Sequence, residues 1–79
     1  MILKIISAED ILFEGEVNSV SLPGKMGEFT VLRNHASLIS VLVPGKIRYK
    51  AATDTNEGEI SVSGGLADID RNVISVCIF

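Results

Sequence analysis

The stretch that decides the fold is LPGKMGEFTVLRNHASLISVLVPGKIRYK, residues 22–50, which holds two Pro-Gly pairs with two short apolar runs between them. Proline fixes φ at about −65° and glycine accepts a positive φ, so Pro23-Gly24 and Pro44-Gly45 each suit the central positions of a type II turn. We therefore expect the chain to reverse direction at both ends of this stretch.

The runs between and beyond these turns have the length and alternation of β-strands. Phe29 and Val31 share one face of the run 27–32. The run 38–43 is nearly continuous in apolar residues, so periodicity does not separate a strand from a buried helix, but its length of six and the Pro-Gly that stops it favour a central strand. Further strand candidates are 3–7, 11–22, 46–50, 59–63, 66–70 and 73–79. Turn signals about every 8 to 12 residues predict an all-β fold, a flattened β-sandwich or barrel of about 8–10 short, mostly antiparallel strands.

Finer features of the pattern predict where strands bend. The apolar phase changes between Val17 and Val20, as expected where a strand bends or switches sheets, and Gly15 suits a bulge. Gly64-Gly65 suits a bend or a close backbone approach, and residues 70–72 (Asp-Arg-Asn) suit a turn. We expect a polar loop at residues 53–58. Alternation places Ile60 and Val62 inward, and it places three residues on one side of the last strand: Ile74, Val76 and Ile78.

Length and composition exclude several classes of protein. At 79 residues we expect one domain, and the net charge of −3 argues against a nucleic-acid partner. No run reaches the about 18 apolar residues of a membrane-spanning helix, and the N-terminus lacks the features of a signal peptide. One histidine and one cysteine are too few for a usual zinc site, and Cys77 is interpreted as core filling. We expect a cytoplasmic protein without metal or cofactor.

His35 is the side chain whose charge can change near neutral pH. As a general base it would need a carboxylate such as Glu28 and a nucleophile such as Ser37 or Ser40. The sequence has no nucleophile elbow to organise them, so a hydrolase is a minor hypothesis. A basic strand face at 46–50 is interpreted as solvated, with contact to an acidic partner or anionic lipid as the alternative: Lys46, Arg48 and Lys50.

Several motifs, in order along the whole chain, carry a family resemblance. They are Ser7-Ala8-Glu9 with Phe13 and Gly15, the segment GEFTVLRNHASL at 27–38, Pro44-Gly45 with Ile47 and Arg48, and Ser63-Gly64-Gly65 with Asn72 and Val73. Together they resemble the β-sandwich domain of the epsilon subunit of F-type ATP synthases, which corresponds to the mitochondrial delta subunit. Arg33 and Ser37 stand where that family commonly has prolines, which leaves the turn around His35 less rigid.

The resemblance implies a non-catalytic rotor subunit of the central stalk. It would link the gamma subunit to the membrane ring of c subunits and couple ion flow to ATP synthesis, without a cofactor or nucleic acid. It would lie at the cytoplasmic face of the cell inner or plasma membrane, attached only through the complex. The resemblance assigns these residues to the side that faces the c ring: Gly27, Glu28, Phe29, Asn34, His35 and Ala36. The turns are formed by Pro23, Gly24, Pro44, Gly45, Gly64 and Gly65.

Many relatives carry two antiparallel helices after this domain. Since the sequence ends at Phe79, within or just after the last predicted strand, we expect a single β-sandwich domain over 1–79 without that C-terminal two-helix domain. The alternative function is a stand-alone β-sandwich that binds a small ligand or a peptide along a strand edge. Copurification with gamma and the c ring would separate the two hypotheses.

Overall fold

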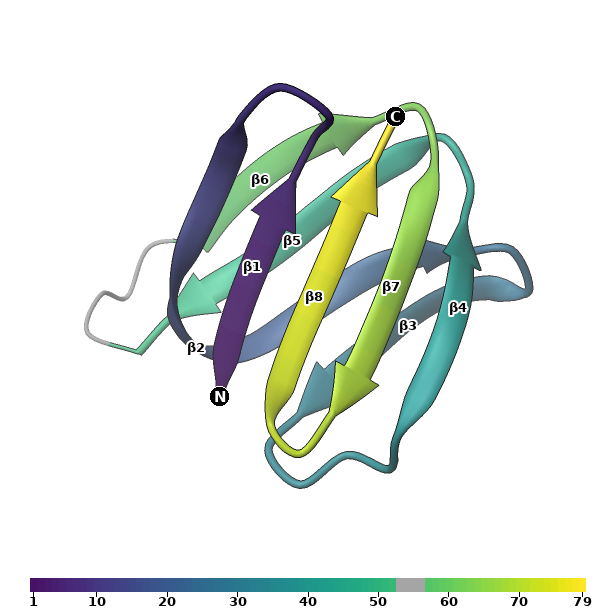
Figure 1. Cartoon of the computed structure of the whole chain (residues 1–79). Coiled ribbons are helices and arrows are strands. Elements are labelled where there is room, and N and C mark those ends of the chain that lie inside the picture. Colours follow the sequence, from purple (N-terminus) through teal and green to yellow (C-terminus); the bar gives the residue numbers. More distant parts are fainter. Residues whose placement is uncertain (53–56) are drawn as a thin grey trace.

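The computed structural model describes residues 1–52 and 57–79, and none of these residues is helical. The strands are β1 (Ile2–Ile6), β2 (Ile11–Gly24), β3 (Gly27–Leu32), β4 (Leu38–Leu42), β5 (Gly45–Ala51), β6 (Glu57–Val62), β7 (Gly65–Asp70) and β8 (Val73–Ile78). Figure 1 shows them as two layers. The predicted all-β class and the predicted number of strands are confirmed.

The long strand β2 belongs to both layers. Its first part pairs with β1 from Ile11 to Glu16, and its second part pairs with β5 and β3 from Val17 onward. The first layer therefore runs β2-β1-β8-β7-β4 and the second runs β3-β2-β5-β6. All pairs are antiparallel except β1 with β8.

The switch between layers lies where the apolar pattern changes phase. The register of β2 with β5 shifts between Val17 and Ser19, as one extra residue in a strand requires. The predicted bend between Val17 and Val20 is confirmed, whereas the predicted bulge at Gly15 is wrong. Gly15 pairs regularly with Leu3, and a Cβ there would lie 3.2 Å from Cζ of Phe13. The small residue accommodates an aromatic ring rather than an extra position in the strand.

The core lies between the layers and is built from alternate residues of the strands. Its buried apolar side chains are Met1, Leu3, Ile5, Val17, Val20, Leu22, Val31, Leu42, Ile47, Val62, Ala67, Ile69, Ile74 and Val76. Phe13 of the first layer contacts Tyr49 of the second, with 4.1 Å between ring centroids. The predicted inward positions on β6 and β8 are confirmed, since Ile60 and Ile78 also pack against this core.

The two Pro-Gly pairs are not type II turns. Pro23 and Gly24 lie inside β2, opposite Glu28 and Gly27, and the chain reverses at Lys25–Met26 instead. A bend at Pro44 leads from β4 into β5, and neither Gly24 nor Gly45 has a positive φ.

These glycines are needed for close approach. A Cβ on Gly24 would lie 2.8 Å from the ring of Phe29, and one on Gly45 would lie 2.9 Å from Cβ of Pro23. Pro23 has no N–H to donate, but its carbonyl accepts the N–H of Val43 at 2.9 Å, so the residue still contributes a hydrogen bond between the strands. Gly65 also lies in a close approach, and here this was the prediction: a Cβ would collide with the carbonyl of Cys77, so the prediction is confirmed.

Two burial predictions are wrong for the same reason. The strand at β4 is confirmed, but Ile39 and Val41 are exposed, and β4 pairs with β2 at only one position, Gly24 with Leu42. Cys77 is exposed as well, because Val76 and Ile78 take the inward positions of β8. In each strand, alternation sends apolar side chains to the outer face of the first layer, which the core does not cover.

Of the predicted polar loop 53–58, residues 53–56 lie outside the described residues. Its last two, Glu57 and Gly58, belong to β6 and pair with Lys50 and Tyr49 of β5. The boundary was predicted too late because glutamate and glycine are depleted in strands, whereas here the cross-strand partners in β5 determine the structure.

Candidate functional site

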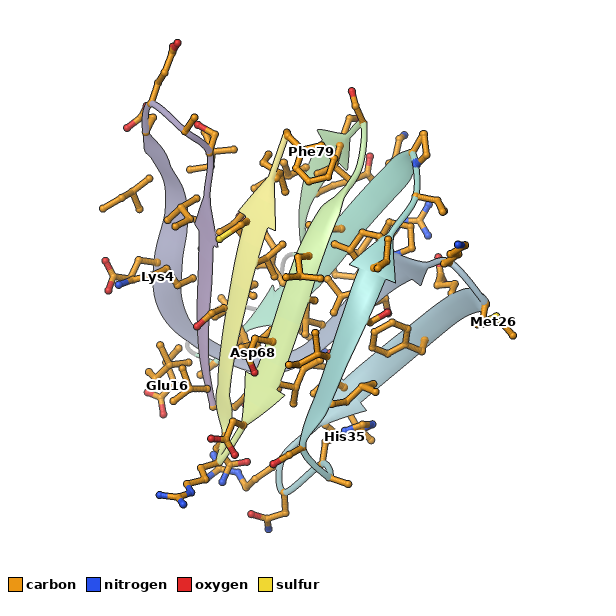
Figure 2. All side chains as sticks on the ribbon, turned by 45° about the vertical axis from the view of Figure 1, so that its right-hand side comes forward. Lys4, Glu16, Met26, His35, Asp68 and Phe79 are labelled. Atoms are coloured by element: carbon orange, nitrogen blue, oxygen red, sulfur yellow. The ribbon has the colours of Figure 1, made fainter. Side chains whose placement is uncertain are left out.

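The predicted c-ring residues lie at the two ends of β3. Gly27, Glu28 and Phe29 begin this strand after the Lys25–Met26 turn, whereas His35 follows its far end (Figure 2). At about 3.3 Å per residue, the backbones of Glu28 and Leu32 are roughly 13 Å apart. The structure therefore separates the two groups, although both flank β3, which among the described strands pairs only with β2. We call this side of the molecule, from Lys25 to Ala36, the β3 edge.

Glu28 belongs to a chain of ion pairs on the outer face of the second layer. Its Oε2 lies 3.7 Å from Nη1 of Arg48, whose Nε donates to Oε2 of Glu59 at 3.2 Å. Nζ of Lys46 lies 3.0 Å from Oε1 of the same Glu59. The hydrogen bonds from Lys46 and then Arg48 lower the pKa of Glu59. Two cations of the basic face thus already have acidic partners on that face.

His35 lies in a four-residue turn that its own backbone closes. The His35 N–H donates to the carbonyl of Leu32 at 3.1 Å, and Asn34 has a φ of 65°, the left-handed conformation that asparagine accepts more readily than most residues. Nδ1 of His35 lies 2.7 Å from the carbonyl of Ala36. A carbonyl only accepts, so Nδ1 is the donor of this hydrogen bond, and Nε2 has no hydrogen bond to the described residues.

The turn at His35 is joined to the β7–β8 turn, which sequence reasoning missed. The N–H of Asn34 donates to Oδ1 of Asn72 at 2.6 Å, and Nδ2 of Asn72 donates back to Oδ1 of Asn34 at 3.1 Å. The Ser37 hydroxyl donates to Oδ1 of Asp70 at 2.8 Å. Asparagine and aspartate at turn positions were the available signal, but nothing local indicates which distant turn they contact.

The groups that a hydrolase would need are bonded elsewhere. Ser37 donates to Asp70, the Ser40 hydroxyl donates to the carbonyl of Val41, and Glu28 faces Arg48. The described residues contain no group of three or more His, Cys, Asp or Glu side chains placed to hold a metal ion. They also include no helix that is long and apolar enough to span a membrane.

The outer face of the first layer carries an apolar row across five strands. Register pairs Val41 with Leu66, Leu66 with Cys77, Cys77 with Ile6, and Ile6 with Ile11. Val41, Leu66 and Ile11 are 51%, 45% and 56% exposed. We call Ile6, Ile11, Val41, Leu66 and Cys77 the apolar row.

The neighbouring row of the same face is polar over four of its five strands. Beyond exposed Ile39 on β4 it contains Asp68, Ser75, Lys4 and Glu14, of which Lys4 and Glu14 form an ion pair at 3.7 Å. The change from an apolar to a charged row within one sheet face is typical of an interaction surface with a polar rim. The apolar run 38–43 was the sequence signal for this surface, but it was interpreted as a core strand.

A groove of about 460 Å³ lies between the β2–β3 turn and β4. Its walls include Met26, Phe29, Leu38 and Ile39, and Met26 is 99% exposed at the tip of the hairpin (Figure 2). The groove is lined mainly by apolar side chains, so it suits an apolar side chain or peptide segment rather than a charged ligand.

Residues 1–78 match the family described as ATP synthase, Delta/Epsilon chain, beta-sandwich domain. The chain belongs to this family. Among the family's curated relatives, the ATP synthase epsilon chain of Campylobacter jejuni subsp. doylei is 43% identical over 74 residues, and that of Janthinobacterium sp. is 34% identical over 76 residues. The alignments cover 94% and 96% of this chain but 57% and 54% of the relatives. This family member thus spans little more than half the length of those epsilon chains.

Solved structures have the fold of this delta/epsilon β-sandwich. A chain in the Euglena gracilis mitochondrial ATP synthase, in a structure of OSCP, F1 and the c-ring, gives a TM-score of 0.90 at 21% identity, covering 99% of this chain and 49% of that one. A chain in the Tetrahymena thermophila central stalk and c-ring structure gives 0.84 at 13%, covering 100% and 63%. The predicted β-sandwich and the predicted family are confirmed.

Proposed function

We propose that this chain is a non-catalytic rotor subunit of an F-type ATP synthase, which links the gamma subunit to the c ring and so couples ion flow to ATP synthesis. The family match over residues 1–78, with curated relatives that are epsilon chains, carries the proposal. The subunit would be peripheral, at the cytoplasmic face of the cell inner or plasma membrane, and held there only by the complex.

The apolar row is the surface we assign to gamma. It offers exposed aliphatic side chains from strands that the core already fixes, so docking costs little additional ordering. Acidic residues in the adjacent rows, such as Asp68 and Glu14, suit a partner whose apolar contact is bordered by basic or hydrogen-bonding groups. This assignment predicts that the gamma surface opposite the row is apolar with a basic border.

The β3 edge is the surface we assign to the c ring. Glu28, which the resemblance places there, shares Arg48 with Glu59, so part of its charge is already balanced. Nε2 of His35 is available for a hydrogen bond at the other end of the edge. Two separated polar contacts on one edge suit a ring that presents polar loops, and each contact can be removed independently.

Copurification tests the proposed function directly. A tagged form of the chain, expressed in its own cell and extracted in mild detergent, should bring gamma and c subunits with it. A tagged chain that elutes without either, while other synthase subunits assemble, would contradict the proposal.

The alternative function is a stand-alone β-sandwich that binds a peptide or apolar ligand, and the groove beside Met26 favours it. It predicts that the chain elutes alone, or with an unrelated partner that Phe29→Ala releases. Phe29 lines the groove and is also one of the predicted c-ring residues, so the identity of the protein that Phe29→Ala releases, an unrelated partner or the c ring, separates the two functions.

A further inference from the structure

The turn that carries His35 is exposed and lacks proline. Arg33, Asn34, Ala36 and Ser37 are all exposed, so core packing does not fix the backbone of this segment. Its own closing bond runs from the His35 N–H to Leu32. A turn of this kind normally samples several conformations, because hydrogen bonds to water compete with its few internal bonds. Something outside the turn has to hold it if His35 is to occupy one position.

The β7–β8 hairpin supplies a rigid point of attachment. The two strands pair at every position from Gly65–Ile78 to Asp70–Val73, and Ile69 and Ile74 beside the turn are buried. The loop Arg71–Asn72 has φ values of 50° and 62°, which is the pattern of a type I′ turn. This short loop directs the Asn72 amide toward the His35 turn, which lies 38 residues away along the chain.

The attachment is made at two points on either side of His35. Asn34 and Asn72 exchange two hydrogen bonds in opposite directions, of 2.6 and 3.1 Å. Three residues later, Ser37 donates to Asp70 at 2.8 Å. One contact would allow the turn to pivot, whereas two contacts fix both its position and its orientation. His35 and Ala36 lie between them.

We propose that Asn72 and Asp70 are positioning residues, which hold the His35 turn in the conformation that binds a partner. They act through Asn34 and Ser37 and not through a contact of their own. The role in binding rests on the proposed function, with the c ring as the partner, but the restraint on the turn can be measured in the isolated chain.

Amide hydrogen exchange of the isolated chain tests the restraint. Asn72→Gly keeps a residue that accepts positive φ and removes the amide, and Asp70→Ala removes the second acceptor. We expect exchange at Asn34 and His35 to rise about fivefold or more for each bond lost. Exchange at buried Ile74 should stay unchanged. Arg71→Gly, in the same loop but without these contacts, is the matched control and should leave Asn34 and His35 unaffected.

Conservative variants and a double-mutant cycle keep the test decisive if Asn72→Gly folds poorly. Asp70→Asn keeps an acceptor for Ser37, and Asn34→Asp keeps an acceptor for Nδ2 of Asn72, so both should retain slow exchange. Asn34→Gly removes one of the two Asn–Asn bonds from the other side, and its effect on His35 should not add to that of Asn72→Gly. Unchanged exchange at Asn34 and His35 in Asn72→Gly and Asp70→Ala would overturn the proposal.

Binding to detergent-solubilised c ring tests the second half. We expect Asn72→Gly and Asp70→Ala to weaken binding about fivefold or more, with Arg71→Gly binding like the wild type. Faster exchange with undiminished ring binding would overturn the positioning role while leaving the proposed function intact. A wild-type chain that binds no ring would contradict the proposed function and the positioning role, whereas the exchange data would still decide the restraint.

Discussion

Gly45 shows how a single position can depend on the residue opposite. A Cβ there would lie 2.9 Å from Cβ of Pro23, which belongs to a rigid ring and cannot rotate away. We expect Gly45→Ala to lower the free energy of unfolding by about 1–3 kcal/mol, because the added methyl group forces β2 and β5 apart. Urea denaturation would measure the change. Exposed Ser63→Ala is the control, and a Gly45→Ala protein as stable as the wild type would show that the strands shift easily.

Arg71 adopts a conformation that suits other residues better. Its φ of 50° at the first position of the type I′ turn is one that asparagine or glycine accepts more readily. Arg71→Asn should therefore raise the free energy of unfolding by about 0.5–1 kcal/mol, measured by the midpoint of thermal or urea unfolding. A loss of stability would mean that the Arg71 side chain makes a stabilising contact in solution.

Glu59, on the outer face of the second layer, makes the stability of the fold depend on pH. Lys46 and then Arg48 lower its pKa from the ordinary value of 4.5, so the folded chain binds this proton more weakly than the unfolded chain does. The stability that it contributes is full above pH 4.5 and is lost as the pH falls through the lower folded value. Glu59→Gln should flatten this part of the acid unfolding profile, whereas Glu9→Gln should not. Identical acid unfolding profiles for Glu59→Gln and the wild type would show that the ion pairs of Glu59 do not stabilise the fold.

Substitution of Glu28, at the start of β3, should affect binding to the c ring more than the stability of the isolated chain. Its pair with Arg48 is exposed and contributes about 0–1 kcal/mol to folding. Glu28→Lys places a cation beside Arg48 and should weaken c-ring binding, yet the isolated variant should lose no more than about 1 kcal/mol of stability. Glu28→Gln is the control that removes the charge without reversing it. If Glu28→Lys unfolds, the residue is structural and the interface assignment is wrong.

The elements also show what the sequence could predict. Period-two alternation identified the inward residues of β3, β6 and β8, because a buried face constrains each second residue. The Pro-Gly pairs were misread, since the same dipeptide serves a turn or a close contact between strands, and only the residue opposite decides. The hydrogen bonds between Asn34 and Asn72 were not predicted because they join residues that lie 38 positions apart in the sequence. No local pattern identifies such a partner.

For the whole molecule, the unpredicted feature is the outer face of the first layer. The apolar run of β4 has the sequence of a core strand, yet Ile39 is 66% and Val41 51% exposed, because none of the described residues covers this face. Cys77 was misassigned for the same reason. A partner that covers this face would explain an otherwise unfavourable exposure of aliphatic side chains, and gamma is the partner that we propose for it.

The assignment of the apolar row to gamma is tested most directly by the affinity of the purified chain for purified gamma, measured by calorimetric titration with wild type and Leu66→Glu. Leu66 lies within the apolar row, 45% exposed and flanked by Val41 and Cys77. We predict that wild type binds and that Leu66→Glu, still folded by circular dichroism, binds at least about tenfold more weakly, a change of about 1.4 kcal/mol. Ser61→Glu, on the outer face of the second layer, should bind like the wild type. Equal affinity of Leu66→Glu and wild type for gamma would contradict the assignment of the apolar row to gamma.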